Sequence, residues 1–191
     1  GGPYHIEIPI DVAKHDHDKV GKAPAQPAPL APDVEQIDAL AAALMAAERV
    51  VILAGGGAKR ADAALGQLAE KLDAPVVLTV NARGMMHKHP LCIPASPSLN
   101  AVREAIAEAD IVLAVGTEFG PTDYDMYAIG DMPAMKRLVR IDICADQLAR
   151  HEAEMCLRAD AGAALEALLA QVSDKPVAGG AVAAKARHCS A

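Results

Sequence analysis

The feature that most restricts the fold is an apolar strand that runs directly into three glycines. Residues 50–54 are uninterrupted apolar residues, most of them β-branched, and Gly55, Gly56 and Gly57 follow them. An apolar run without alternation is typical of a strand covered on both faces in a parallel sheet. Glycines let the backbone turn sharply, and a helix that starts near Arg60 would present N–H groups to an anion. The stretch therefore indicates a nucleotide-type turn.

A second interpretation of this turn stays open. A dinucleotide-binding fingerprint requires a further glycine where the helix packs on the strand, and Arg60 stands at that position. A tight strand–helix connection that binds nothing is therefore an equal alternative, and the rest of the chain must decide between the two.

The same alternation of strands and helices repeats along the chain. Apolar runs predict further strands at 74–80, 91–93, 110–116, 138–143 and 155–160. Apolar residues at helical spacing predict helices at 33–49, 61–72, 100–109 and 161–172, with a short helical turn in 147–154. Asp33 after Pro32, with Gln36 three residues later, is the expected N-cap of the first helix. Repeated βα units with short loops predict a doubly wound α/β fold, a Rossmann-like sheet of about six parallel strands flanked by helices.

The two ends of the chain differ from this pattern. Residues 4–10 alternate apolar and polar side chains, which predicts a strand with one solvated face, the last strand of a preceding domain. Residues 13–32 are rich in proline and are typical of an interdomain linker. The His-Asp repeat at 15–18 could ligate a metal, but a solvated charged stretch is favoured. Residues 33–172 form the main domain, and 173–191 lose all periodicity and are expected to be a tail.

Composition excludes several functional classes. A net charge of −7 argues against a nucleic-acid interface, and no apolar run reaches the ~20 residues of a membrane span. The first residues lack the pattern of a secretory signal. The four cysteines form no CxxC pair, so they are expected to be buried free thiols of a cytoplasmic protein.

Several polar or small residues fall where the predicted strands end. They are Gly55, Gly56, Gly57, Thr79, Gly116 and Asp142. Ligands of doubly wound sheets bind at the carboxyl ends of the strands, so these six residues are the candidate cofactor-binding set. The acidic residues at 118, 123 and 125 could bind a cation, although solvated loop carboxylates are the favoured interpretation.

The order of motifs resembles that of thiamine-diphosphate-dependent enzymes, the acetolactate-synthase-like group in particular. The resemblance rests on Gly-Pro-x-His-Ile-Glu-Ile-Pro at 2–9, Ile-Leu-Ala-Gly-Gly-Gly-Ala at 52–58, Thr-x-x-Ala-Arg-Gly at 79–84, Ala-Asp-x-Val-Leu-Ala-Val-Gly-Thr at 109–117 and Arg-Ile-Asp-Ile at 140–143. It implies that 1–12 end a pyrimidine-binding domain and that 33–172 are the central domain. Thiamine diphosphate and Mg²⁺ would then be held by flanking domains, in a homodimeric or homotetrameric 2-oxo acid decarboxylase or carboligase.

The resemblance also implies that this part of the enzyme is not catalytic alone and contributes no catalytic or metal-binding residue. Flavin-binding members hold FAD in the central domain, which would place it against the six candidate residues. Two departures argue against FAD here: Cys92 to Ser96 replace a Gly-Met-x-Gly stretch, and Glu118 stands where an arginine is usual. An empty scaffold is favoured, and a free-standing module that binds FAD, NAD or ADP is the alternative.

Overall fold

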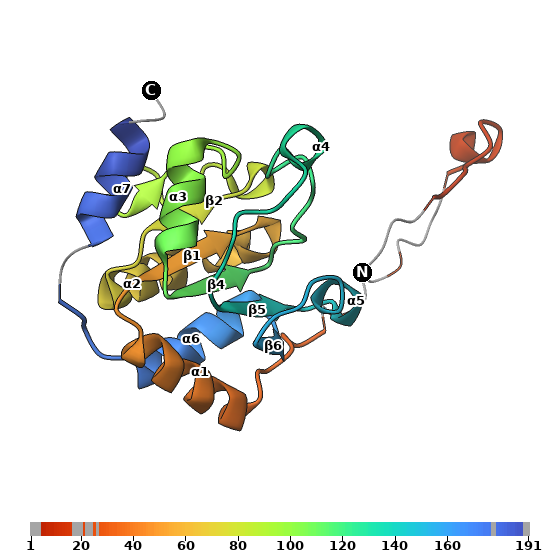
Figure 1. The fold of residues 1–191 in the computed structure, drawn as a ribbon. Helices are drawn as coiled ribbons and strands as arrows, with labels where there is room; N and C mark the ends of the chain where they lie inside the picture. The colour runs from red at the N-terminus through yellow and green to blue at the C-terminus, as the bar shows by residue number, and fades with distance from the viewer. Residues whose placement is uncertain (1–4, 17–20, 22–24, 26, 177–178, 189–191) are drawn as a thin grey trace.

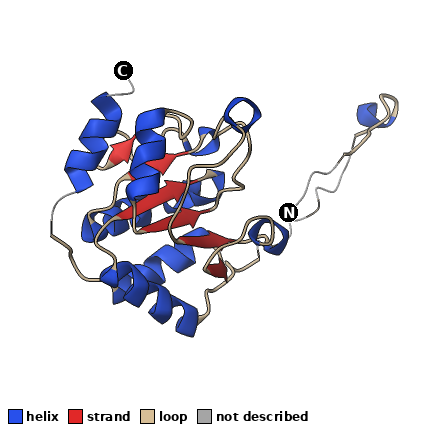
Figure 2. Ribbon diagram, in the orientation of Figure 1, coloured by secondary structure: helices blue, strands red, loops and turns tan. Residues whose placement is uncertain are grey.

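Six parallel strands form one sheet at the centre of the molecule (Figures 1 and 2). The structure is a computed structural model that describes residues 5–16, 21, 25, 27–176 and 179–188. The strands are β1 (Val50–Ala54), β2 (Val76–Leu78), β3 (Cys92–Ile93), β4 (Ile111–Val115), β5 (Leu138–Asp142) and β6 (Met155–Arg158). Their order across the sheet is β3-β2-β1-β4-β5-β6. The predicted doubly wound α/β fold is confirmed, with the reversal of strand order between β1 and β4.

Helices cover both faces of the sheet. They are α1 (Val34–Ala46), α2 (Asp62–Leu72), α3 (Asn100–Glu108), α4 (Met126–Ile129), α5 (Ala145–Leu148), α6 (Ala161–Gln171) and α7 (Gly179–His188), with 3₁₀ turns η1 (Val12–Lys14), η2 (Gly56–Ala61) and η3 (Val80–Ala82). The helices α1, α2 and α6 pack on one face and α3 and α7 on the other (Figure 1). The short helix predicted in 147–154 begins and ends earlier. No helix among the described residues is long and apolar enough to cross a membrane.

The central strand β1 shows why its sequence is apolar throughout. Val50 and Ile52 contact the core beneath α1, α2 and α6, whereas Val51 and Leu53 contact the core beneath α3 and α7. Five consecutive residue pairs join β1 to β4 in parallel. A strand buried on both faces has no solvated side to carry polar residues, which explains the absence of alternation.

The predicted N-cap of α1 is confirmed. The Gln36 backbone N–H donates to Asp33 Oδ1 at 3.0 Å, so the carboxylate satisfies one of the N–H groups that a helix start leaves unpaired.

The predicted N-terminal strand is wrong over its described part, residues 5–10. These residues form no strand, and Ile6, Ile8 and Ile10 are 79%, 65% and 78% exposed. A strand requires a neighbour to pair its backbone groups, and the described part of this chain places none beside the segment. The proline-rich stretch after it forms no regular structure where it is described, apart from the end of the 3₁₀ turn η1.

The predicted C-terminal tail is also wrong, because it contains α7. Ala183 and Ala186 are buried against the sheet beside α3. The Gly179 N–H donates to the Asp73 carboxylate, and a Cβ at Gly179 would overlap the Asp73 carbonyl oxygen. The buried face of α7 consists of alanines, whose small side chains give little periodic contrast in the sequence.

The cysteines are less buried than predicted. Those that the structure describes are free thiols, but only Cys92 is buried; Cys144 is half-buried and Cys156 is exposed.

Asp110 joins the amino ends of β1 and β4. Its Oδ2 accepts from the Arg49 backbone N–H at 2.9 Å, and its Oδ1 lies 3.2 Å from Lys136 Nζ. The Arg49 N–H, followed by the Lys136 ammonium, holds the pKa of the Asp110 carboxyl below its ordinary range.

Acid is therefore expected to weaken this connection. A carboxylate with a lowered pKa stabilises the fold fully above its ordinary pKa of ~4, and the stabilisation is lost as pH falls through the lowered value. Asp110→Asn should make the free energy of unfolding less sensitive to pH below ~4, by less than ~1 kcal/mol because the site is partly exposed. Urea unfolding at pH 7 and pH 3 measures this. Asp38→Asn, at an exposed position of α1, is the matched control; equal effects of both substitutions would contradict the assignment.

Candidate functional site

A hollow of about 490 Å³ lies at the carboxyl ends of β1, β2 and β4. We call it the glycine hollow. Its walls include Gly56, Gly57, Thr79, Asn81, Gly116 and Thr117. It lies beside the reversal of strand order, where doubly wound sheets bind ligands.

The structure brings together four of the six predicted site residues. Gly56, Gly57, Thr79 and Gly116 line the glycine hollow. Gly55 is buried directly after β1 and does not line the hollow. Asp142 ends β5, and its Oδ1 accepts from the Cys144 backbone N–H at 2.8 Å. A role in binding stays a prediction for all six residues.

The glycines allow the carboxyl ends of β1 and β4 to pack closely against each other. The Gly55 N–H donates to the Val115 carbonyl oxygen at 2.9 Å, and the Gly57 N–H donates to the Gly116 carbonyl oxygen at 3.0 Å. A Cβ at Gly57 would lie 2.9 Å from Gly116 Cα, and Gly116 adopts a φ of +58°. The backbones of two turns about 60 residues apart therefore touch directly.

This packing changes the anion site that the sequence indicated. The glycines lead into the 3₁₀ turn η2, and α2 begins only at Asp62. The Ala58 N–H donates to the Gly55 carbonyl oxygen at 3.0 Å, and the Gly57 N–H is used by Gly116. These two N–H groups are satisfied within the protein, so they do not point at a ligand as those of a helix start would.

The charges around the glycine hollow are mixed. Lys59 lies on its wall, but so do Glu118 and Asp123. Asp123 Oδ1 accepts from the Val80 N–H at 2.9 Å and so joins the loop after β4 to the loop after β2. From the sequence, Asp123 was expected to be a solvated carboxylate. A contact across 43 residues gives no signal in a single sequence.

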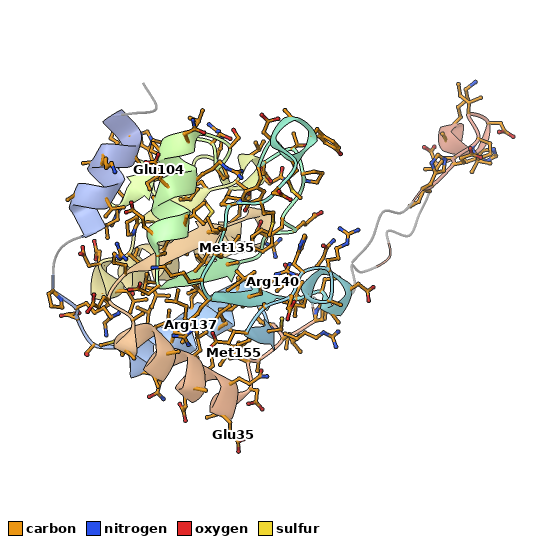
Figure 3. The ribbon with its side chains drawn as sticks, viewed as in Figure 1. Glu35, Glu104, Met135, Arg137, Arg140 and Met155 are labelled. Atoms are coloured by element: carbon orange, nitrogen blue, oxygen red, sulfur yellow. The ribbon has the colours of Figure 1, made fainter. Side chains whose placement is uncertain are left out.

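Arg140 is a buried charge beside this region that was not among the residues predicted for the site. It lies in β5 (Figure 3), and its side chain is 1% exposed. Its Nη1 donates to the Leu148 carbonyl oxygen at 3.2 Å, and its Nη2 donates to the Thr117 carbonyl oxygen at 3.3 Å. Burial lowers the pKa of the Arg140 guanidinium. The one available signal was a charged residue inside an apolar strand.

Aromatic residues of the loop after β4 pack over Arg140. The Phe119 ring centroid lies 4.9 Å from Arg140 Cζ and 5.7 Å from the Tyr124 centroid. His151 meets Phe119 edge-on at 5.4 Å. Phe119 adopts a left-handed backbone with φ of 54°, so this packing holds a conformation that a bulky residue rarely adopts. Among the described residues, the Tyr124 hydroxyl is buried with no hydrogen-bond partner.

Two further observations limit the chemistry of the site. Among the described residues, no cluster of three or more His, Cys, Asp or Glu side chains could hold a metal ion. The walls of the glycine hollow offer backbone, hydroxyl and amide groups, together with the side chains of Lys59, Glu118 and Asp123. The Asp123 carboxylate is engaged by the Val80 N–H.

Residues 37–168 match the family described as "Thiamine pyrophosphate enzyme, central domain". The chain belongs to this family. It is 38% identical over 174 residues to the "Probable 2-ketoarginine decarboxylase AruI" of Pseudomonas aeruginosa. The matched residues cover 89% of this chain and 31% of that protein. It is 31% identical over 189 residues to the acetolactate synthase isozyme 1 large subunit of Escherichia coli, covering 92% and 32%. The family resemblance is confirmed.

This central domain is also similar in fold to a solved structure. The benzoylformate decarboxylase of Polynucleobacter necessarius superposes with a TM-score of 0.65 at 18% identity, over 88% of this chain and 32% of that one. The chain spans about a third of the length of the relatives it matches. The central domain therefore corresponds to one part of larger proteins.

Proposed function

We propose that this chain is the central scaffold of a thiamine-diphosphate-dependent enzyme that decarboxylates or ligates 2-oxo acids, and that it is not catalytic alone. The observation that carries the proposal is the family match, because relatives of that family include proteins named decarboxylase and acetolactate synthase. The described residues contain no cluster that could hold a metal ion, and the reactive groups would belong to flanking domains. Thiamine diphosphate would supply the carbanion chemistry there, with Mg²⁺ as its counter-ion.

The N-terminal segment supports the proposed domain organisation. The alternating, exposed side chains of Ile6, Ile8 and Ile10 have the pattern of a strand without a neighbour. We propose that this segment is the end of a pyrimidine-binding domain. Residues 13–32 would then be the linker, in a cytoplasmic homodimer or homotetramer.

We further infer that the glycine hollow does not bind a dinucleotide. The Gly57 and Ala58 N–H groups bond within the protein, and Glu118 and Asp123 would repel a pyrophosphate. Calorimetry of the chain with FAD, NAD and ADP should give no saturable binding below ~1 mM. Glu118→Arg reverses one charge and should strengthen ADP binding if repulsion is the cause. Micromolar affinity of the unaltered chain would instead support the free-standing nucleotide-binding module.

The function is tested on the longer protein that contains this chain. We expect CO₂ release from a 2-oxo acid, with 2-ketoarginine, pyruvate and benzoylformate as the first substrates, only when thiamine diphosphate and Mg²⁺ are added. The 191-residue chain should turn over none of these. Activity of the longer protein without thiamine diphosphate, or turnover by the chain alone, would refute the proposal.

A further inference from the structure

The loop after β4, residues 116–125, is built around the Phe119 ring. The centroid of this ring lies 4.9 Å from Arg140 Cζ, 5.7 Å from the Tyr124 centroid and 5.4 Å from the His151 centroid. We call these four residues the Phe119 cluster. Arg140 belongs to β5 and His151 to the segment between α5 and β6, so the cluster joins the loop to two other parts of the fold.

Phe119 has a backbone conformation that its surroundings must maintain. Its φ of 54° lies in the left-handed region, which is unfavourable for a bulky side chain. Phe119 is buried, so packing within the cluster offsets this cost. If one partner of the ring leaves, the conformation loses part of what maintains it. The loop near Phe119 is therefore sensitive to any change in the cluster.

His151 is the member of the Phe119 cluster whose charge can change near neutral pH, because an imidazole ordinarily titrates at ~6.5. Its ring meets Phe119 edge-on, and among the described residues it forms no hydrogen bond or ion pair. Burial lowers the pKa of the His151 imidazole, and the positive charges of Arg140 and Arg150 lower it further. The neutral ring is therefore the form that fits this packing.

The other titratable groups around the cluster do not offset a charge on His151. In the loop, burial raises the pKa of the Tyr124 phenol, which stays neutral at pH 7, and Asp123 acts on Tyr124. Asp142 and Cys156, from β5 and β6, act on the buried guanidinium. In the described structure, the charged side chains that act on His151 are both cations. A protonated ring would add a further cation here, and it is exposed enough to turn into solvent instead.

The first half of the loop depends on the Phe119 cluster. The Thr117 carbonyl oxygen accepts from Arg140 Nη2 at 3.3 Å, and Phe119 follows two residues later. Glu118 and Gly120, on either side of Phe119, line the glycine hollow together with Thr117. A movement of this half would therefore change the wall of the hollow.

Two contacts outside the cluster hold the second half of the loop. The Val80 N–H donates to Asp123 Oδ1 at 2.9 Å, and Arg103 Nη1 donates to the Tyr124 carbonyl oxygen at 3.2 Å. Neither contact involves an imidazole, so both should persist when histidines are protonated. A change at His151 should therefore affect the two halves of the loop differently.

We propose that the Phe119 cluster is a pH-sensitive switch of the loop after β4. With a neutral His151 the loop is packed, and residues 117–120 form part of the wall of the glycine hollow. When His151 is protonated, its ring leaves Phe119 for solvent, and residues 117–120 move while the second half of the loop stays in place. This inference does not rest on the proposed function, because it concerns contacts within this chain alone.

The direction of the pH effect follows from the lowered pKa of His151. A released ring titrates near the ordinary ~6.5, whereas the packed ring takes up its proton only at a lower pH. The neutral ring therefore stabilises the packed loop fully above pH ~6.5, and this stabilisation is lost as the pH falls through that value toward the lowered one. A difference of one pH unit between the two midpoints would change the ratio of packed to released loop by up to ~10-fold.

A pH titration of the ¹⁵N-labelled 191-residue chain tests the switch. Between pH ~8 and ~5, the amide signals of 117–120 should shift with the same midpoint as the imidazole signal of His151, and this midpoint should lie below ~6.5. The amide signals of Asp123 and Tyr124 should move far less. Arg150→Gln removes one exposed cation and should raise both midpoints together by ~0.2–0.5.

His151→Phe keeps a ring against Phe119 but removes the titrating group. Its 117–120 amide signals should match those of the unaltered chain at pH ~8 and should not move at pH ~5. His151→Gln removes the ring, so its 117–120 signals should resemble the acid form of the unaltered chain at both pH values. This second variant keeps the switch testable if phenylalanine is not accommodated.

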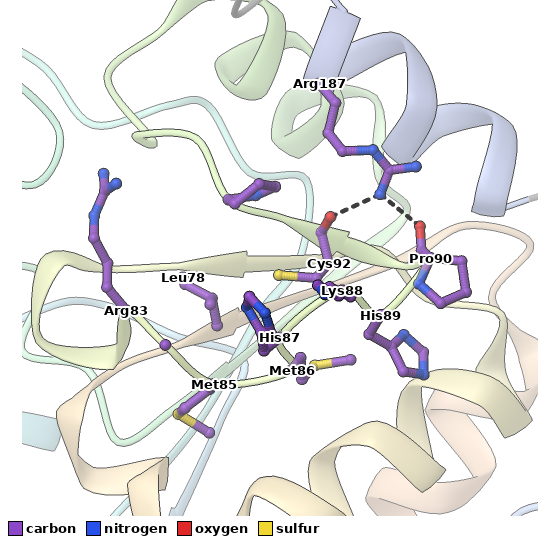
Figure 4. A pocket seen from close by; sticks show the side chains of 12 residues that line it. Leu78, Arg83, Met85, Met86, His87, Lys88, His89, Pro90, Cys92 and Arg187 are labelled. Atoms are coloured by element: carbon purple, nitrogen blue, oxygen red, sulfur yellow. Dashed lines mark hydrogen bonds between the residues drawn. The ribbon is translucent and has the colours of Figure 1, made fainter.

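His87→Gln is the matched control. His87 is an exposed imidazole that lines a separate hollow of about 610 Å³ at the β3 edge (Figure 4), which shares no lining residue with the glycine hollow. This variant should leave the pH response of 117–120 unchanged. The proposal is overturned if the 117–120 signals stay fixed down to pH ~5, if they move equally in His151→Phe, or if His87→Gln abolishes their shift.

Discussion

Gly55→Ala is expected to destabilise the fold by ~3 kcal/mol or more, a large part of the 5–15 kcal/mol typical of a domain. A Cβ at Gly55 would lie 2.2 Å from the Gly116 carbonyl oxygen and 2.6 Å from Thr117 Cα. Both are backbone atoms, so no side-chain rotation relieves the overlap. The β1 and β4 turns would have to separate at the middle of the sheet.

Gly55 isolates this steric effect better than its neighbours. Its φ of −105° and ψ of −175° are accessible to alanine, so the substitution adds no backbone strain. At Gly116, with φ of +58°, strain and overlap would act together. A Cβ at Gly56 would come no closer than 3.1 Å to the atoms around it, the nearest being Asn81 Cβ, a side-chain atom. We therefore expect Gly55→Ala to cost more than Gly57→Ala, and Gly57→Ala more than Gly56→Ala.

Gly66→Ala is the matched control for this series. Gly66 lies inside α2, and a Cβ there would meet no atom within 4 Å. Alanine should stabilise the helix by ~0.5–1 kcal/mol. Urea unfolding followed by circular dichroism gives both values. If Gly55→Ala unfolds at the same urea concentration as Gly66→Ala, the close contact between the two turns is not required for stability.

The contrast between β1 and its glycines shows what a single sequence can predict. The apolar runs at 50–54 and 111–115 sit between two helix layers, so burial on both faces was readable from residue type alone. The Asp33 cap was equally readable, because its donor lies three residues away. The three glycines predicted a turn. Their contact with Gly116 could not be predicted, because it depends on how distant strands pair.

The elements that were predicted wrongly had either a weak local signal or a misleading one. Helix α7 buries alanines, which carry too little hydrophobic contrast to mark one face, and it begins with two glycines. Residues 5–10 carry a strand pattern but have no neighbouring strand in the described structure. The Asp123 link to Val80 and the placement of Arg140 under the loop both depend on tertiary contacts.

Arg140→Ala is expected to destabilise the fold by ~3 kcal/mol. The substitution leaves the Leu148 and Thr117 carbonyl oxygens without the donors they have now, and it opens a cavity beside Phe119. An unsatisfied buried acceptor costs ~1–3 kcal/mol, and lost packing adds to this. Arg140→Met restores most of the volume but not the donors, so about half of the loss should remain. Arg140→Lys should fall between them, because one ammonium lacks the fork that reaches two carbonyls.

Arg137→Ala is the control for Arg140, because Arg137 lies three residues earlier, immediately before β5. Arg137 forms a two-pronged ion pair with Glu154, at 2.7 and 2.6 Å, and the pair is solvent-accessible. Exposed ion pairs contribute ~1 kcal/mol or less to stability. Arg137→Ala should therefore lose little stability, even though it breaks a salt bridge. Chemical unfolding compares the two variants, and amide spectra should show changes at 117–124 for Arg140→Ala alone. Equal losses for both arginines would mean that the loop after β4 is held by its aromatic packing, without the buried guanidinium.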